Sequence, residues 1–160
     1  MHGARPRRDS PSGRAWWEIL PASETVIPSL KIKPGDTMAA FVQNTAGNKW
    51  TIAIADETTG KLFTIDKTYK GPGTSAEFIL EAPSNPQGRL PLAHYKQTQF
   101  FNLALGVNFG SPGDAVLTFP NNAIAMVPKG KQVSTPSKPT NNSFSIAYGK
   151  KQPPAPATAR

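Results

Sequence analysis

Apolar and polar residues alternate with a period of two in several short stretches of the chain, which glycine, proline and asparagine clusters separate. The clearest stretch is "NKWTIAIAD", residues 48–56, in which Trp50, Ile52 and Ile54 share one face of an extended segment. No segment keeps the three-to-four-residue spacing of an amphipathic helix for long. The pattern predicts an all-β chain.

Turn-forming residues link these stretches into hairpins. The segment "ETTG", residues 57–60, separates residues 48–56 from "KLFTIDKTY", residues 61–69, and predicts a hairpin turn. Further strands are expected at residues 37–44, 97–105, 123–127 and 143–149, and Pro-Gly and Gly-Pro-Gly turns are expected within residues 31–37 and 70–75. This number of short strands predicts an antiparallel two-sheet β-sandwich with a jelly-roll or concanavalin A-like arrangement.

The expected strand at residues 76–82, within "GTSAEFILEAP", carries two carboxylates. Alternation places Glu77, Ile79 and Glu81 on one face and Phe78 and Leu80 on the other. Apolar neighbours desolvate a carboxylate and suit it for proton transfer. A solvated outer face of an antiparallel sheet explains the same pattern without any chemistry.

The 160 residues suffice for one domain with a hydrophobic core. Residues 1–14, "MHGARPRRDSPSGR", read as a disordered basic leader, and residues 150–160 as a disordered tail rich in proline and alanine. The domain is therefore expected over residues 15–149. No apolar run is long enough to span a membrane, and the short "AWWEIL" after the arginines is no signal-peptide core.

Composition excludes several kinds of chemistry. The chain has no cysteine, and its two histidines, His2 and His94, are far apart in sequence, so thiol catalysis is excluded and a metal site is not expected. The net charge of +8 comes from the two ends, because residues 15–128 hold eight basic and nine acidic residues. No aromatic-plus-basic motif of a nucleic-acid-binding module accompanies this charge, so a specific nucleic-acid partner is not expected.

Three stretches together resemble the glutamic peptidases, the eqolisin family of acid endopeptidases. They are "AWWEILPA", residues 15–22, "SAEFILEAP", residues 75–83, and "LPLAHYKQTQFFNLAL", residues 90–105. Their order and approximate spacing are similar to those of the family. The resemblance implies a fold of two antiparallel sheets with an active site on the concave face, a polypeptide substrate, no metal or cofactor, and secretion of the full-length protein.

Residue by residue, the resemblance implies that Glu77 is the general base that activates water, with Glu81 as a neighbour. Trp16 matches a tryptophan that lines the family's substrate cleft, and Glu18, two residues on and facing the same way, is a further polar group expected there. Phe78 stands where the family has tryptophan. His94, Tyr95 and Lys96 replace the usual acid or amide, phenylalanine and glycine.

The chain also departs from the family at the second catalytic group, a glutamine amide that stabilises the oxyanion. The family's glutamine segment precedes the "AWWEILPA" match, but residues 1–14 contain no glutamine. The sequence therefore predicts an incomplete peptidase domain with little or no activity. Two alternatives stay open, which are a non-catalytic β-sandwich module that binds carbohydrate or protein, and a structural fragment with unpaired strand edges.

Overall fold

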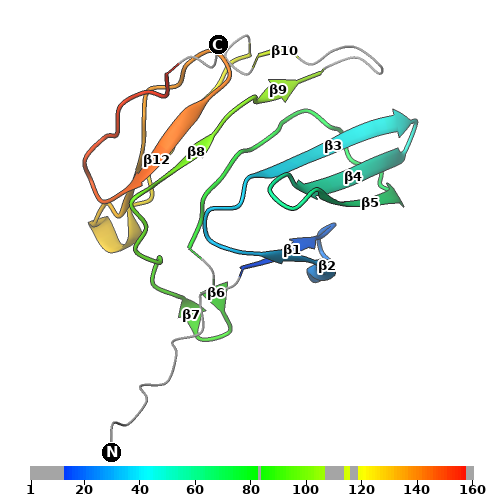
Figure 1. Ribbon diagram of the computed structural model, residues 1–160, viewed down its shortest axis with the longest axis horizontal. Coiled ribbons are helices and arrows are strands. Elements are labelled where there is room, and N and C mark those ends of the chain that lie inside the picture. Colours follow the sequence, from blue (N-terminus) through cyan, green and yellow to red (C-terminus); the bar gives the residue numbers. More distant parts are fainter. Residues whose placement is uncertain (1–12, 83, 107–113, 116–118, 158–160) are drawn as a thin grey trace, which may run out of the picture. The chain divides into compact units, whose positions relative to one another are not determined.

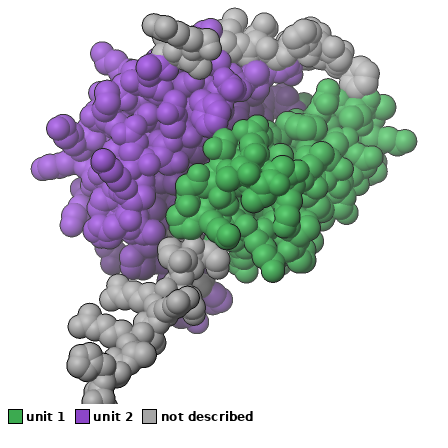
Figure 2. Space-filling view, viewed as in Figure 1, with its two compact units in different colours: residues 1–72 green, residues 73–160 purple. Residues whose placement is uncertain are grey.

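The computed structural model describes residues 13–82, 84–106, 114–115 and 119–157. Its strands are antiparallel, and the described residues contain one short 3₁₀ helix, η2 (Pro128–Gly130). The chain divides into two compact units, residues 1–72 and residues 73–160, which Figure 2 colours separately. The all-β prediction is confirmed.

The first unit contains two small sheets (Figure 1). Strands β3 (Met38–Ala46), β4 (Lys49–Asp56) and β5 (Lys61–Thr68) form a meander, and β1 (Gly13–Trp17) pairs with β2 (Thr25–Ile32). The meander confirms the strands expected at residues 37–44, 48–56 and 61–69 and the turn expected at residues 57–60, because hairpins between neighbouring strands depend mainly on local sequence.

The core of this unit lies between the two sheets. Ala15, Ile27 and Leu30 are buried there, and Ile54 of β4 and Phe63 of β5 pack against them. Ile54 and Phe63 face each other in the β4–β5 register, so the meander presents one continuous apolar face to the β1–β2 pair. Burial of this shared face holds the two sheets together.

Strand β2 was not among the predicted elements. It contains Pro28, which cannot donate a ladder hydrogen bond and therefore weakens a strand pattern. The structure accommodates Pro28 where the register shifts, since Arg14 pairs with Lys31 but Trp16 pairs with Val26. Proline within strands is typical of such irregularities.

The second unit is built around a three-stranded sheet in the order β11 (Ser134–Pro136), β12 (Phe144–Tyr148), β8 (Gln97–Phe100). Phe144 and Phe100 are paired in register, and their rings stack with centroids 4.9 Å apart. The unit also contains two short pairs. They are β6 (Ser84–Asn85) with β7 (Gly88–Arg89), and β9 (Ala104–Leu105) with β10 (Asp114–Ala115).

Three expectations for the second unit need correction. Residues 76–82 belong to no strand, and residues 123–127 contribute only the isolated bridge between Met126 and Ser134. The strand expected over residues 97–105 is divided into β8 and β9, because the backbone turns at Asn102, which has a positive φ of 55°. Apolar alternation favours extended backbone, but a ladder also needs a partner at the right distance.

The predicted leader and tail stay predictions. Residues 1–12 and 158–160 lie outside the described residues. Residues 150–157 are described and form no strand, although Pro153 is buried and the Gln152 side chain donates a hydrogen bond to the Pro136 carbonyl at 3.2 Å. The jelly-roll connectivity likewise stays a prediction.

Candidate functional site

The segment that carries Glu77 keeps the two-faced character that its sequence predicts, although it forms no ladder. Phe78 and Leu80 are half-buried, whereas Glu77, Ile79 and Glu81 are exposed. Exposure therefore alternates along residues 77–81 as it does in a strand with one wet face. The exposure of these side chains therefore follows the sequence pattern, although the segment pairs with no other described residues.

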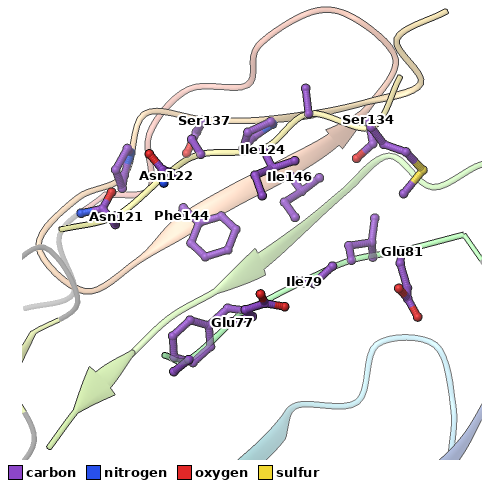
Figure 3. A pocket seen from close by; sticks show the side chains of 18 of the residues that line it. Glu77, Ile79, Glu81, Asn121, Asn122, Ile124, Ser134, Ser137, Phe144 and Ile146 are labelled. Carbon is purple, nitrogen blue, oxygen red and sulfur yellow. The ribbon is translucent and has the colours of Figure 1, made fainter. Parts of the chain in front are cut away.

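This segment lines a cavity of about 650 Å³ within the second unit. A second wall comes from residues 119–127, β11 and β12 supply much of the remainder, and Arg89 and Leu105 also contribute. Figure 3 shows Glu77, Ile79 and Glu81 on one wall and Asn121, Asn122 and Ile124 on another, with Phe144 and Ile146 between them in this view. The lining is mainly apolar with a few polar groups, as in many ligand sites.

Both carboxylates of the cavity wall are accessible. Neither Glu77 nor Glu81 forms an ion pair or hydrogen bond with another described residue. Figure 3 shows the Glu81 side chain pointing away from Phe144 and Ile146. The desolvation expected around Glu77 is not seen, because this residue is exposed, but its position places a carboxylate on the wall of the cavity.

The two carboxamides on the facing wall were not among the predicted site residues. Asn121 donates a hydrogen bond to the Phe119 carbonyl at 3.0 Å, and Asn122 is exposed with no hydrogen-bond partner among the described residues. In the sequence, "PNN" after an apolar run reads only as a turn. Nothing in that local pattern indicates that it faces a carboxylate elsewhere in the chain.

The other predicted site residues belong to the first unit. Trp16 lies on β1 opposite Val26, and 41% of its surface is exposed. Glu18 follows the end of β1 and is also exposed, while the intervening Trp17 is half-buried and packs on the core. Trp16 and Glu18 therefore share the outward face, as the sequence predicts, and neither lines the cavity of the second unit.

A tyrosine and histidine cluster lies beside the same sheet. The Tyr95 hydroxyl is 2.7 Å from the Ser134 hydroxyl, and the Tyr148 hydroxyl is 3.1 Å from Nε2 of His94. The rings of His94 and Tyr148 contact each other with centroids 4.2 Å apart. These contacts give His94, Tyr95 and Tyr148 a structural role in fixing residues 94–95 against β12.

The described residues contain no group of three or more histidine, aspartate or glutamate side chains arranged to hold a metal ion. No helix in the described part of the chain has both the length and the apolar character needed to cross a membrane.

Comparisons with known proteins agree with the antiparallel two-sheet class. A crystal structure of aspergilloglutamic peptidase from Aspergillus niger matches with a TM-score of 0.71 and 19% sequence identity, over 84% of this chain and 79% of that one. No curated protein sequence matches. The model of the Peptidase A4 family matches residues 5–148. The chain belongs to the Peptidase A4 family, the glutamic peptidases.

Proposed function

We propose that this protein is a glutamic endopeptidase of low turnover in which Glu77 is the general base. The observation that carries the proposal is the position of Glu77. The carboxylate that the family resemblance selects is exposed on the wall of a mainly apolar cavity of about 650 Å³. A cavity of this size accommodates several residues of a polypeptide substrate.

The proposed reaction needs only a carboxylate and water. The ionised Glu77 carboxylate removes a proton from water, and the resulting hydroxide attacks the carbonyl carbon of the peptide bond. The protonated Glu77 then donates that proton to the leaving nitrogen as the carbon–nitrogen bond breaks. The carboxylate is regenerated, and no metal or cofactor enters the cycle.

Low turnover is proposed because the oxyanion donor in this cavity is an asparagine in place of the glutamine that the family resemblance implies. None of the six glutamines, all of them in the described part of the chain, lines the cavity that contains Glu77. The carboxamides that do line it are Asn121 and Asn122. Because the Asn121 amide already donates to Phe119, we assign the oxyanion contact to Asn122, whose N–H groups are free within the described residues.

Trp16 and Glu18 complete the proposal as substrate-binding residues. Both present exposed side chains on the outward face of β1 and the residues that follow it. An exposed indole offers a large apolar surface to a peptide side chain at low entropic cost. By the same family resemblance, the protein is proposed to be secreted.

The decisive experiment compares Glu77→Gln with Glu81→Gln in an assay of protein cleavage at acid pH with pepstatin present. Both substitutions remove one charge from the same exposed face, so their effects on solubility and folding are matched. Loss of cleavage in Glu77→Gln alone supports the assignment. Full activity of Glu77→Gln would show that another group is the base.

A binding module is the second candidate function, and one observation favours it. Glu77 is exposed on a segment that pairs with no other described residues, whereas a general base gains from a water-excluded setting. Peptide binding without cleavage by the wild-type chain would decide in favour of this candidate. A carbohydrate ligand would be separated from a polypeptide by competition with soluble oligosaccharides.

A further inference from the structure

The backbone of residues 73–82 has no hydrogen-bonded partner among the described residues. No ladder, bridge, turn hydrogen bond or side-chain hydrogen bond joins any N–H or C=O group of this segment to another described residue. Residues 74–79 and 81 are exposed or half-exposed, and the exposure of residues 77–81 alternates from one residue to the next. Within the described part of the chain, this segment therefore has the strand-like alternation and the unpaired backbone groups of an open β-edge.

On the facing wall of the cavity, backbone hydrogen bonding between described residues stops at Met126. Met126 forms two backbone hydrogen bonds with its neighbours, from its N–H to the Ser134 carbonyl and from the Val133 N–H to its own carbonyl. Residues 120–125, immediately before it, form no backbone hydrogen bond to another described residue. The ladder beside β11 therefore ends at one bridge, and the cavity lies between two segments whose backbones lack partners among the described residues.

We infer that residues 73–82 form a docking edge for an extended polypeptide that adds as a β-strand and carries basic side chains opposite Glu77 and Glu81. The inference goes beyond the proposed function, since it concerns backbone pairing and charge and needs no catalysis. Strand addition satisfies the N–H and C=O groups that have no partner within the described residues, and alternate side chains give specificity.

Charge complementarity identifies this occupant. Glu77 and Glu81 lie on one face with Ile79 between them, and the described part of the cavity lining contains a single cation, Arg89. Oppositely charged residues directly across two strands attract, and like charges repel. A matching strand therefore has lysine or arginine at two positions four residues apart and an apolar residue midway, opposite Ile79.

Charge also makes a second copy of the chain a poorer partner for residues 73–82. An antiparallel pairing of two copies centred on Ile79 places Glu77 of one copy opposite Glu81 of the other. Each copy then contributes two carboxylates to one small patch, and like charges facing each other destabilise the pair. The acidic face favours a basic partner over self-association.

The experiment measures binding of a fluorescein-labelled nine-residue peptide at neutral pH by fluorescence anisotropy. The peptide has lysine at its third and seventh positions, valine at its fifth and threonine elsewhere. Two further peptides of the same sequence carry N-methyl groups on one or the other set of alternate amides, which removes the backbone donors of one edge at a time. Mass spectrometry confirms that each peptide stays intact.

We expect saturable binding of the parent peptide and a loss of affinity of about tenfold or more for one of the two methylated peptides. Glu81→Lys is expected to weaken binding about threefold to tenfold, because it replaces an attractive cross-strand pair by a repulsive one. The control is Glu57→Lys, the same charge reversal at an exposed turn residue of the first unit. Circular dichroism of both variants confirms that they fold.

Three results would overturn the inference. They are the absence of saturable binding, equal binding of all three peptides, and a dimer of the chain whose formation excludes the peptide. Saturable binding of the intact peptide at neutral pH supports the inference whatever the cleavage assay at acid pH shows, so the two proposals can fail separately. If neither methylation nor Glu81→Lys affects binding and cleavage is still seen at acid pH, the docking inference fails and the peptidase proposal stands.

Discussion

Thr59 donates two hydrogen bonds to the Asp56 carboxylate, from its backbone N–H at 3.1 Å and from its hydroxyl at 2.6 Å. Together they close the turn between β4 and β5 around a buried acid. The hydroxyl hydrogen bond from Thr59 is the main reason that the pKa of Asp56 is lowered below its usual value. Hydrogen bonds of this kind favour the ionised form.

The first prediction concerns acid stability. Because the folded-state pKa of Asp56 lies below its unfolded value of about 3.9, its contribution is complete above that pH and is lost as the pH falls through the lower folded value. Asp56→Asn is therefore expected to reduce the free energy of unfolding at neutral pH and to flatten its decline below about pH 4. Denaturant titrations at several pH values measure both effects. An unchanged pH dependence would contradict this role.

A second prediction concerns the core of the first unit. Ile27 is 2% exposed between the two small sheets, so Ile27→Ala should lower the free energy of unfolding by about 2–5 kcal/mol. Val26→Ala is the matched control on the opposite face of the same strand, where 39% of the side chain is exposed. Its cost should be about 1 kcal/mol or less. Equal losses would mean that the buried face of β2 is wrongly assigned.

A third prediction separates the two asparagines of the cavity wall. If Asn122 donates to the oxyanion, Asn122→Ala should lower kcat by about 100-fold to 1000-fold with little change in KM. Asn121→Ala should have a smaller effect, because that amide is already bonded to Phe119. Asn48→Ala, in the turn between β3 and β4, serves as a distant control. Cleavage kinetics of one peptide substrate compare all three variants.

A fourth prediction concerns Trp16 as a substrate-binding residue. Trp16→Ala should raise KM by about tenfold and change kcat less, because the indole is proposed to contact substrate away from the reacting bond. Leu62→Ala removes another exposed apolar side chain of the same unit, 65% exposed on β5, and should leave KM unchanged. A similar rise in both variants would point to general destabilisation.

The sequence predicts the meander of the first unit well and the second unit less well, for a physical reason. Strands β3, β4 and β5 follow one another directly, and the two turns between them are encoded at Gly47–Asn48 and at residues 57–60. Residues 76–82 have an equally clear alternation, but a strand in a ladder needs a partner that no local pattern supplies. The face assignments of Glu77 and Phe78 were therefore confirmed while their ladder was not.

The residues of the candidate site also differ in whether the sequence could predict them. Family motifs select Glu77, and the structure places it on a cavity wall. Asn122 could not be selected, because its relation to Glu77 arises from chain segments more than 40 residues apart that fold onto one cavity. Trp16 and Glu18 were correctly predicted to share one face, since that relation is local to β1.

The short connections of the β3–β4–β5 meander also bear on how the chain folds. Its ladders join strands that are neighbours in sequence, whereas β8 pairs with β12 across more than 40 intervening residues. Closing a short loop costs less chain entropy than closing a long one, and proteins rich in local contacts fold faster. The meander therefore completes its hydrogen bonds early, and during synthesis it can do so before the ribosome has reached β12.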